Sequence, residues 1–158
     1  MTELKCAERV RRHLAAEGIA FEVTEHREAF TAQEMAAAAH VPGARVAKAV
    51  MLMADGGLVM AVLAAPDHLS MTKARAALGA KAVRLATEAE FAAAFPDCEL
   101  GAAPPFGAVY GIPTYLDERL LGAESIVFAA GSHRHSIRLA LAAYLQGARP
   151  SQADLAAG

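Results

Sequence analysis

The chain has 158 residues, of which 55% are hydrophobic and 20% charged, and its formal net charge is −2. Length and composition favour one folded globular domain, expected to span residues 1–158. They exclude a disordered chain and a broad basic surface for non-specific nucleic-acid binding. No apolar run approaches the roughly 18 residues of a membrane span.

In the first half of the chain, apolar periodicity and turn residues predict three helices and three strands. Thr31 and Glu34 form a capping box at the start of the second helix. Asp55-Gly56-Gly57 joins two apolar runs, which predicts an antiparallel hairpin at the centre of a sheet. The predicted elements are a helix at 3–17, a strand at 19–24, a helix from Thr31 to about His40, strands at 46–54 and 58–65, and a helix at 70–78.

The second half continues with short strands and two helices. The glycine- and proline-rich stretch 97–113 predicts a shaped loop at its start. The predicted elements are a strand at 81–86, a helix opened by the capping box Thr87/Glu90 and ended before Pro96, strands at 107–110 and 113–116, a strand pair at 125–130 and 135–139, a helix at 140–146 and a frayed tail from Gly147. This irregular order predicts an α+β (mixed α/β) domain with a mixed sheet.

Lys48 lies inside the otherwise apolar strand 46–53, on the face of Val46, Val50 and Leu52. An ammonium group is costly to bury without a partner. Three explanations stay open from the sequence: a salt bridge, a side chain that reaches solvent from a sheet edge, or a charge aimed at an anionic ligand or a reacting carbonyl.

The loop from Gly101 to Gly107 carries few functional side chains, so any chemistry it performs must come from its backbone. Its prolines stiffen the path, and its glycines permit close approach, so it could hold N–H groups toward a developing oxyanion. A tight connection between elements explains the same residues equally well. Covalent catalysis has no candidate, because Cys6 and Cys98 have no histidine nearby and no Gly-x-Ser-x-Gly turn occurs.

Cofactor and metal sites are not expected. No Gly-x-Gly-x-x-Gly or Walker-type loop occurs, and the six histidines form no His-x-x-x-His pair. With two cysteines and no secretory signal, we expect a reduced cytoplasmic protein. A local basic stretch remains, which is either a solvated face or a tRNA contact; it comprises Lys73, Arg75, Lys81 and Arg84.

Four segments in the same order resemble one family, the YbaK/EbsC or prolyl-tRNA synthetase-associated editing domains, over about residues 3–146. The segments are Glu25-His26 with Phe30-Thr31-Ala-Gln-Glu34, Val41-Pro-Gly with Val46-Ala-Lys48-Ala-Val50, Gly101-Ala-Ala-Pro-Pro105-Phe-Gly107, and Val127-Phe-Ala-Ala-Gly131-Ser-His133 with Ile137-Arg-Leu139. The resemblance implies a curved mixed sheet flanked by helices and an aminoacyl-tRNA deacylase, an ester hydrolase that acts on mischarged tRNA.

The resemblance also implies a site. Its key lysine falls on Lys48 and its Gly-x-x-x-Pro loop on Gly101 and Pro105, which makes Lys48 and Gly101 the candidate catalytic residues. The candidate substrate-binding residues are Phe30, Thr31, Ala102, Ala103, Pro104, Pro105, Gly131, Ser132 and His133. Lys48 would contact the terminal phosphate or the substrate carbonyl, and the N–H groups of 101–105 would fix the ester. Phe30 and the two alanines would limit the pocket to a small amino acid.

The implied partners are the acceptor end of tRNA and an aminoacyl-tRNA synthetase, with no cofactor and no membrane. Two other functions remain open. One is a non-catalytic tRNA- or nucleotide-binding module of the same fold, and the other is a hydrolase of some other small acyl ester. A structural Lys48, paired with a buried carboxylate, is the corresponding alternative for the site.

Overall fold

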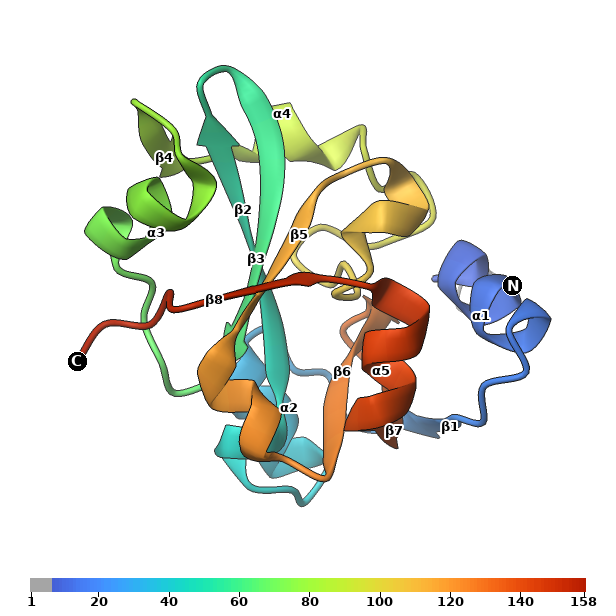
Figure 1. The fold of residues 1–158 in the computed structure, drawn as a ribbon. Coiled ribbons are helices and arrows are strands. Elements are labelled where there is room, and N and C mark those ends of the chain that lie inside the picture. Colours follow the sequence, from blue (N-terminus) through green and yellow to red (C-terminus); the bar gives the residue numbers. More distant parts are fainter. Residues whose placement is uncertain (1–6) are drawn as a thin grey trace.

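The computed structural model describes residues 7–158, so Cys6 and the start of the helix predicted at 3–17 lie outside the described residues. Its strands form two sheets with helices around them, which confirms the α+β class (Figure 1). One sheet has the order β1-β7-β6, and it holds β1 (Glu22–Glu25), β6 (Ser125–Ser132) and β7 (His135–Ala140). The other has the order β4-β2-β3-β5-β8, and it holds β2 (Ala47–Ala54), β3 (Gly57–Ala64), β4 (Val83–Leu85), β5 (Thr114–Asp117) and β8 (Ser151–Ala153).

The helices surround these sheets, and each predicted helix is present in the described part of the chain. They are α1 (Glu8–Ala16), α2 (Ala32–Ala38), α3 (Met71–Leu78), α4 (Glu88–Ala92) and α5 (Leu141–Ala148), with short 3₁₀ turns η1 (Gly43–Arg45), η2 (Gly107–Tyr110) and η3 (Glu118–Gly122). Both predicted capping boxes are confirmed: the Thr31 hydroxyl accepts from Glu34 N–H, and the Thr87 hydroxyl accepts from Glu90 N–H.

The predicted hairpin is confirmed at the centre of the larger sheet, where β2 and β3 pair antiparallel from Ala47↔Ala64 to Ala54↔Gly57. The sheet is mixed, because β3 pairs parallel with β5 and β5 pairs parallel with β8. A parallel neighbour requires a long crossover. Here the chain between β3 and β5 supplies it, with α3, β4, α4 and the glycine- and proline-rich loop.

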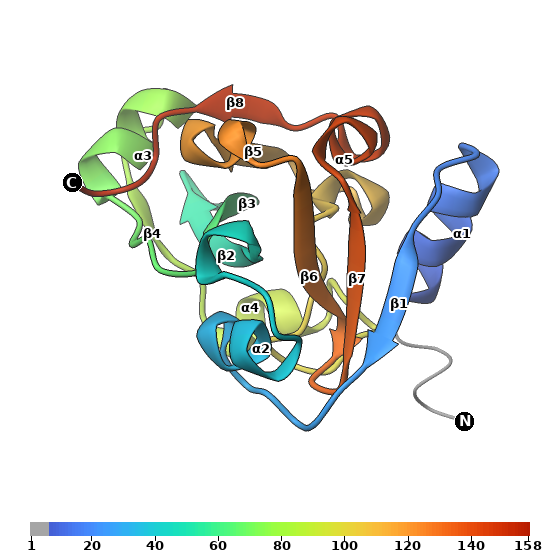
Figure 2. The same ribbon diagram turned by 90° about the horizontal axis from the view of Figure 1, so that it is seen from below.

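The two sheets meet at an isolated parallel bridge between Val46 and Val127. Beyond that bridge β2 and β6 separate, and Figure 2 shows β6 and β7 standing apart from β2 and β3. Strand β4 covers the outer edge of β2 only from Leu52 to Ala54. The first half of β2 therefore borders the space between the sheets.

Two predictions about local structure are wrong. The strand predicted at 107–110 is the 3₁₀ turn η2. A Cβ on Gly107 would lie 2.3 Å from the Thr114 hydroxyl and 2.8 Å from the Ile112 carbonyl, so this close turn needs glycine. Gly111 then ends the turn with φ +75°.

The tail predicted to fray from Gly147 is ordered instead. Helix α5 continues through Ala148, and β8 follows it as an edge strand beside β5. The fully buried Asp117 carboxylate accepts the N–H groups of Leu155 (2.8 Å) and Ala156 (3.0 Å), which are also buried. A polar anchor on another strand is invisible to local periodicity, and this explains the error.

The largest apolar cluster takes residues from strands of both sheets and from α1 and α5. Three rings form its middle: Phe106 packs 5.5 Å from Phe128 and 5.2 Å from Tyr144 between ring centroids. The Tyr144 hydroxyl donates to Pro105 O at 2.7 Å, which satisfies the polar end of this buried ring. The glycine- and proline-rich loop is thus fixed to the core from behind.

Candidate active site

A small pocket of about 70 Å³, open to solvent, lies where β2 and β6 separate. Seven of the predicted site residues line it: Phe30, Thr31, Lys48, Gly101, Ala103, Ser132 and His133. The remaining lining residues are His26, Ala29, Ala32, Met35, Ala47, Ala49 and Ala129. Four segments that are far apart in sequence thus meet at one hollow: the start of α2, strand β2, the 101–103 loop and the end of β6.

Four predicted site residues are buried outside the lining: Ala102, Pro104, Pro105 and Gly131. Gly131 N–H donates to Ala102 O at 2.9 Å, and Gly131 O accepts from Glu99 N–H at 2.7 Å. These bonds join the loop to the end of β6. The structure therefore places these residues behind the pocket, where they hold its walls in position.

The Lys48 ammonium is held at the pocket by two backbone carbonyls. It donates to Ala65 O at 3.0 Å and to Asp67 O at 2.5 Å, both in the segment that follows β3. An ammonium group has three N–H donors, so one remains for a ligand. The alternative of a structural ion pair is not supported, since within residues 7–158 no carboxylate lies in salt-bridge range of Lys48.

Burial lowers the pKa of Lys48, and the nearby Asp67 partly opposes that shift. The Asp67 carboxylate itself faces Arg119, with Oδ1 3.3 Å from Nη1. Lys48 thus carries a charge that its surroundings compensate only in part. An anionic group that enters the pocket would favour the charged form.

Two residues of the 101–105 loop, Gly101 and Ala103, line the same pocket. The two prolines of the 101–105 loop have no N–H, and Ala102 N–H donates to Glu99 O at 3.0 Å. The N–H groups of Gly101 and Ala103 have no recorded partner within the described chain. The predicted set of loop donors therefore reduces to these two residues, both of which line the pocket.

Strand β2 contributes a polar edge as well. Val46 O accepts from Ala65 N–H on the β3 side. Peptide groups of an antiparallel strand point to alternate sides, so those of Ala47 and Ala49 point away from β3. The polar groups of this edge belong to the backbone, so the apolar side chains of the sequence give no sign of them.

His133 connects two walls of the pocket. Its Nδ1 lies 3.2 Å from Ala29 O and its Nε2 lies 2.9 Å from Leu100 O. Its ring packs on Phe30 with 4.7 Å between centroids. A neutral imidazole has one N–H, so both contacts are hydrogen bonds only when the ring carries two protons. The His133 ring thus joins the segment of Ala29 to the segment of Leu100.

A polar chain that sequence reasoning missed runs behind Ser132. The Ser132 hydroxyl lies 2.7 Å from His135 Nδ1, and His135 Nε2 lies 3.8 Å from the Glu25 carboxylate. The hydroxyl also accepts from Arg134 N–H at 3.0 Å. The register of β1 with β7, which pairs Glu25 with His135, brings the acid there. That pairing cannot be read from either segment alone.

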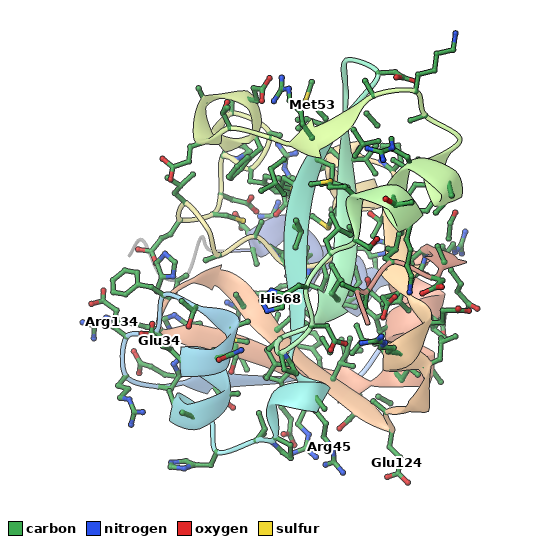
Figure 3. All side chains as sticks on the ribbon, turned by 90° about the vertical axis from the view of Figure 1, so that its left-hand side faces the viewer. Glu34, Arg45, Met53, His68, Glu124 and Arg134 are labelled. Atoms are coloured by element: carbon green, nitrogen blue, oxygen red, sulfur yellow. The ribbon has the colours of Figure 1, made fainter. Side chains whose placement is uncertain are left out.

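The basic stretch does not gather at the pocket. It lies on α3 and around β4, and β4 pairs with the far end of β2, near Met53 in Figure 3, whereas Arg45 marks the near end. Lys73 Nζ pairs with Asp154 at 3.0 Å, and Arg84 pairs with Glu90 at 2.7 Å. Arg75 and Lys81 are exposed. At least half of the stretch thus serves local ion pairs.

Residues 7–158 contain no cluster of three or more His, Cys, Asp or Glu side chains that could hold a metal ion. In the same residues, no helix has both the length and the apolar character that crossing a membrane requires.

Three comparisons relate the chain to known proteins. A family model described as "Aminoacyl-tRNA editing domain" matches residues 26–146. A proline–tRNA ligase of Acidithiobacillus ferrooxidans is 34% identical over 128 residues, which is 79% of this chain and 22% of the ligase. A proline–tRNA ligase of Shouchella clausii is 36% identical over 103 residues, which is 65% of this chain and 18% of that ligase.

Among solved structures, a protein described as a "putative trans-editing enzyme for prolyl tRNA synthetase" superposes with a TM-score of 0.84 at 28% identity. The match covers 96% of this chain and 97% of that protein. The chain thus corresponds to about a fifth of the length of the ligases and to nearly all of the solved neighbour. The resemblance predicted from the four segments is confirmed.

Proposed function

Because the chain belongs to the aminoacyl-tRNA editing domain family, we propose that it hydrolyses the ester bond of a mischarged tRNA that carries a small amino acid. The observation that supports this most is that Lys48 lines one open pocket together with Gly101 and Ala103, whose N–H groups have no partner in the described chain. One free ammonium N–H and two free amide N–H groups provide donors for an ester and a phosphate without any covalent nucleophile.

The proposed hydrolysis requires the protein mainly to place the ester and a water molecule correctly. An aminoacyl ester is already activated, so the enzyme must orient it, hold a water molecule and stabilise the oxyanion. In our proposal Lys48 contacts the terminal phosphate or the ester carbonyl. Gly101 and Ala103 N–H groups hold the oxygen that gains negative charge, and the terminal ribose hydroxyl helps to orient the water.

The walls favour a small side chain. Ala29, Ala103 and Ala129 contribute only methyl groups, and Phe30 with His133 forms a larger barrier at one side. Two of the relatives are proline–tRNA ligases, which makes tRNA for proline the first acceptor to test and a synthetase the expected partner. The cytoplasm, where tRNA is charged, is the expected location.

The test is deacylation of purified tRNA for proline that carries alanine, cysteine, serine or proline. Loss of one aminoacyl bond at a catalytic rate is the expected result for the wild-type chain. Lys48→Ala should lower kcat/KM by about 10²–10³-fold, the usual effect of removing one donor to the oxyanion. Arg12→Ala is the control, since that arginine is exposed on α1, outside the pocket and outside the basic stretch.

Three results would contradict parts of this proposal. Full activity of Lys48→Ala would show that the lysine takes no part in the reaction. Binding of charged tRNA without loss of the ester would indicate the non-catalytic module. Hydrolysis of small acyl esters but of no charged tRNA would indicate a different substrate class.

A further inference from the structure

Phe30 is the one exposed phenylalanine or tyrosine of residues 7–158. Its exposed fraction is 62%, the highest among the large apolar side chains that remain exposed, of which the others are Val23, Leu85 and Leu100. A single exposed apolar residue is common on protein surfaces and needs no explanation by itself. Phe30 differs from the other three because it also lines the pocket that contains Lys48.

The Phe30 ring is held in place although it is exposed. Phe30 N–H donates to the Glu34 carboxylate at 2.8 Å, at the capping box of α2. The ring packs on His133 with 4.7 Å between centroids. The His133 ring nitrogens lie 3.2 Å from Ala29 O and 2.9 Å from Leu100 O, so this support is itself joined to two segments. A flat apolar surface that is already ordered loses little conformational entropy when it binds a ligand.

The pocket beside Phe30 is too small to enclose a nucleoside. Its volume is about 70 Å³, whereas sites that enclose a drug-sized ligand measure roughly 300–1,000 Å³. An ester with a small side chain could enter it, but the base that the same ribose carries must stay at the rim. Phe30 both lines the pocket and reaches solvent, so it lies at that rim.

We infer that Phe30 is a stacking platform for the terminal nucleobase of the tRNA acceptor end, an inference that rests on the proposed function. The 3′ end of a tRNA is single-stranded, so its last base is free to stack on a protein ring. The ester then lies in the pocket, the ribose at its rim and the base on Phe30. A protein partner fits this surface less well, because a chain docked on Phe30 would cover the opening through which the ester enters.

Substitutions at Phe30 test the platform through KM. We expect Phe30→Ala to raise KM for the charged tRNA by about 5–100-fold, the usual effect of losing one stacked base, and to leave kcat within about threefold. Phe30→Tyr keeps a flat ring and should stay close to the wild type, as should Leu85→Ala, at an exposed apolar residue of β4 outside the pocket. An unchanged KM in Phe30→Ala, or a KM equally raised in Phe30→Tyr, would overturn the inference.

A second hollow supplies a competing place for the base. It shares Gly101 and Ala103 with the pocket, and Phe91 lines it on the other side. Phe91→Ala should leave KM close to that of the wild type. A raised KM in Phe91→Ala together with an unchanged KM in Phe30→Ala would place the base in this hollow and overturn the inference.

A fluorescence test needs no turnover. The chain contains no tryptophan, so Phe30→Trp introduces a single one and keeps an aromatic face at the rim. The ligand is an RNA hairpin with the acceptor stem of tRNA for proline, whose terminal ribose carries alanine through an amide bond in place of the ester. Stacking of the last base should quench the tryptophan, and the same RNA without that base should leave its emission unchanged.

Leu85→Trp is the matched control, since Leu85 is 55% exposed and lies on β4, away from the pocket. Its emission should not change with either RNA. Absence of quenching in Phe30→Trp, or quenching that does not depend on the base, would overturn the inference. The proposed function fails separately, when the wild-type chain leaves every charged tRNA intact. An active wild type without base-dependent quenching in Phe30→Trp removes only the platform.

Discussion

The thiol of Cys98 lies between the Asp97 carboxylate and the Tyr110 hydroxyl, at 3.5 Å and 3.6 Å from Sγ. Tyr110 donates its own proton to Asp97 at 2.8 Å. Burial is the main cause that raises the pKa of Cys98 to about 12. This agrees with the sequence-based view of an incidental thiol, because a nucleophilic cysteine needs a lowered pKa.

The raised pKa predicts slow alkylation of Cys98. Near pH 9 an unfolded chain has about half of this thiol ionised, whereas the folded chain has roughly a hundredth or less. Folding stability that depends on this proton is present below pH 9 and is lost as pH rises toward the folded pKa. Iodoacetamide at about pH 9 should therefore modify Cys98 at least about 50-fold faster in urea than in buffer.

Cys6 provides a background signal in that experiment, so peptide mass spectrometry must separate the two sites. A Cys98→Ser chain gives the rate of Cys6 alone. Equal rates for Cys98 in folded and unfolded chains would contradict the burial of this thiol.

Single residues were predictable from sequence where they broke a pattern. Lys48 is conspicuous because a charge interrupts an apolar strand, and the structure places it in the pocket. His135 is not predictable in this way, because a histidine at a strand end breaks no rule. Its contact with Glu25 comes from a cross-strand register that joins residues about 110 positions apart in the chain.

At the scale of elements, the N-cap of α2 sets one wall of the pocket. Thr31 caps the helix through Glu34 N–H at 3.0 Å, and the Glu34 carboxylate accepts from Phe30 N–H at 2.8 Å. The cap therefore fixes the entry of the chain into α2 just where Phe30 and Thr31 line the pocket.

Thr31→Ala should lower the free energy of unfolding by about 1 kcal/mol, the usual effect of losing an N-cap. Thr72→Ala, at an exposed site inside α3, should change it by less than about 0.5 kcal/mol. Urea unfolding of the two variants measures the difference. Equal effects would show that the cap contributes nothing measurable to stability.

Elements with local signals were predicted well. Capping boxes and the Asp-Gly-Gly turn are chemical signals confined to a few residues, and the helices and the hairpin that they mark are confirmed. The strand predicted at 107–110 is wrong, because the same short apolar segment is also compatible with a close 3₁₀ turn. Thr114 and Ile112 leave no room for a side chain at position 107, and these neighbours lie outside the segment from which the strand was predicted.

At the scale of the whole molecule, Asp117 fastens the C-terminal segment to the larger sheet. Its buried carboxylate accepts two N–H groups of that segment and the N–H of Arg119 at 3.2 Å. The Arg119 guanidinium also donates to Gly158 O at 2.7 Å. These contacts hold the segment that follows β8 against the larger sheet.

Asp117→Ala should lower the free energy of unfolding by about 2–4 kcal/mol, because it leaves buried N–H groups without an acceptor. Asp154→Ala removes a carboxylate from the same segment, but from an exposed ion pair with Lys73, so its effect should stay within about 1 kcal/mol. Chemical denaturation compares them. Amide hydrogen exchange at Leu155 and Ala156 should become fast only in Asp117→Ala, and protection in that variant would contradict the anchor.

The division into two sheets was the part of the architecture least accessible from sequence. Strand patterns specify which residues face a core, but not whether β2 and β6 stay paired beyond Val46 and Val127. The pocket exists because they separate there. Its location could be predicted only through the resemblance of four segments, since no single segment defines it.

The rings of Phe106, Phe128 and Tyr144 fill the space behind the point where the two sheets part. Phe128 belongs to β6 and Tyr144 to α5, while Phe106 closes the loop that begins at Gly101, so one aromatic cluster ties together three separate parts of the chain. A smaller side chain at any of the three positions would loosen the joint between that loop and β6, at a distance from every residue that lines the pocket.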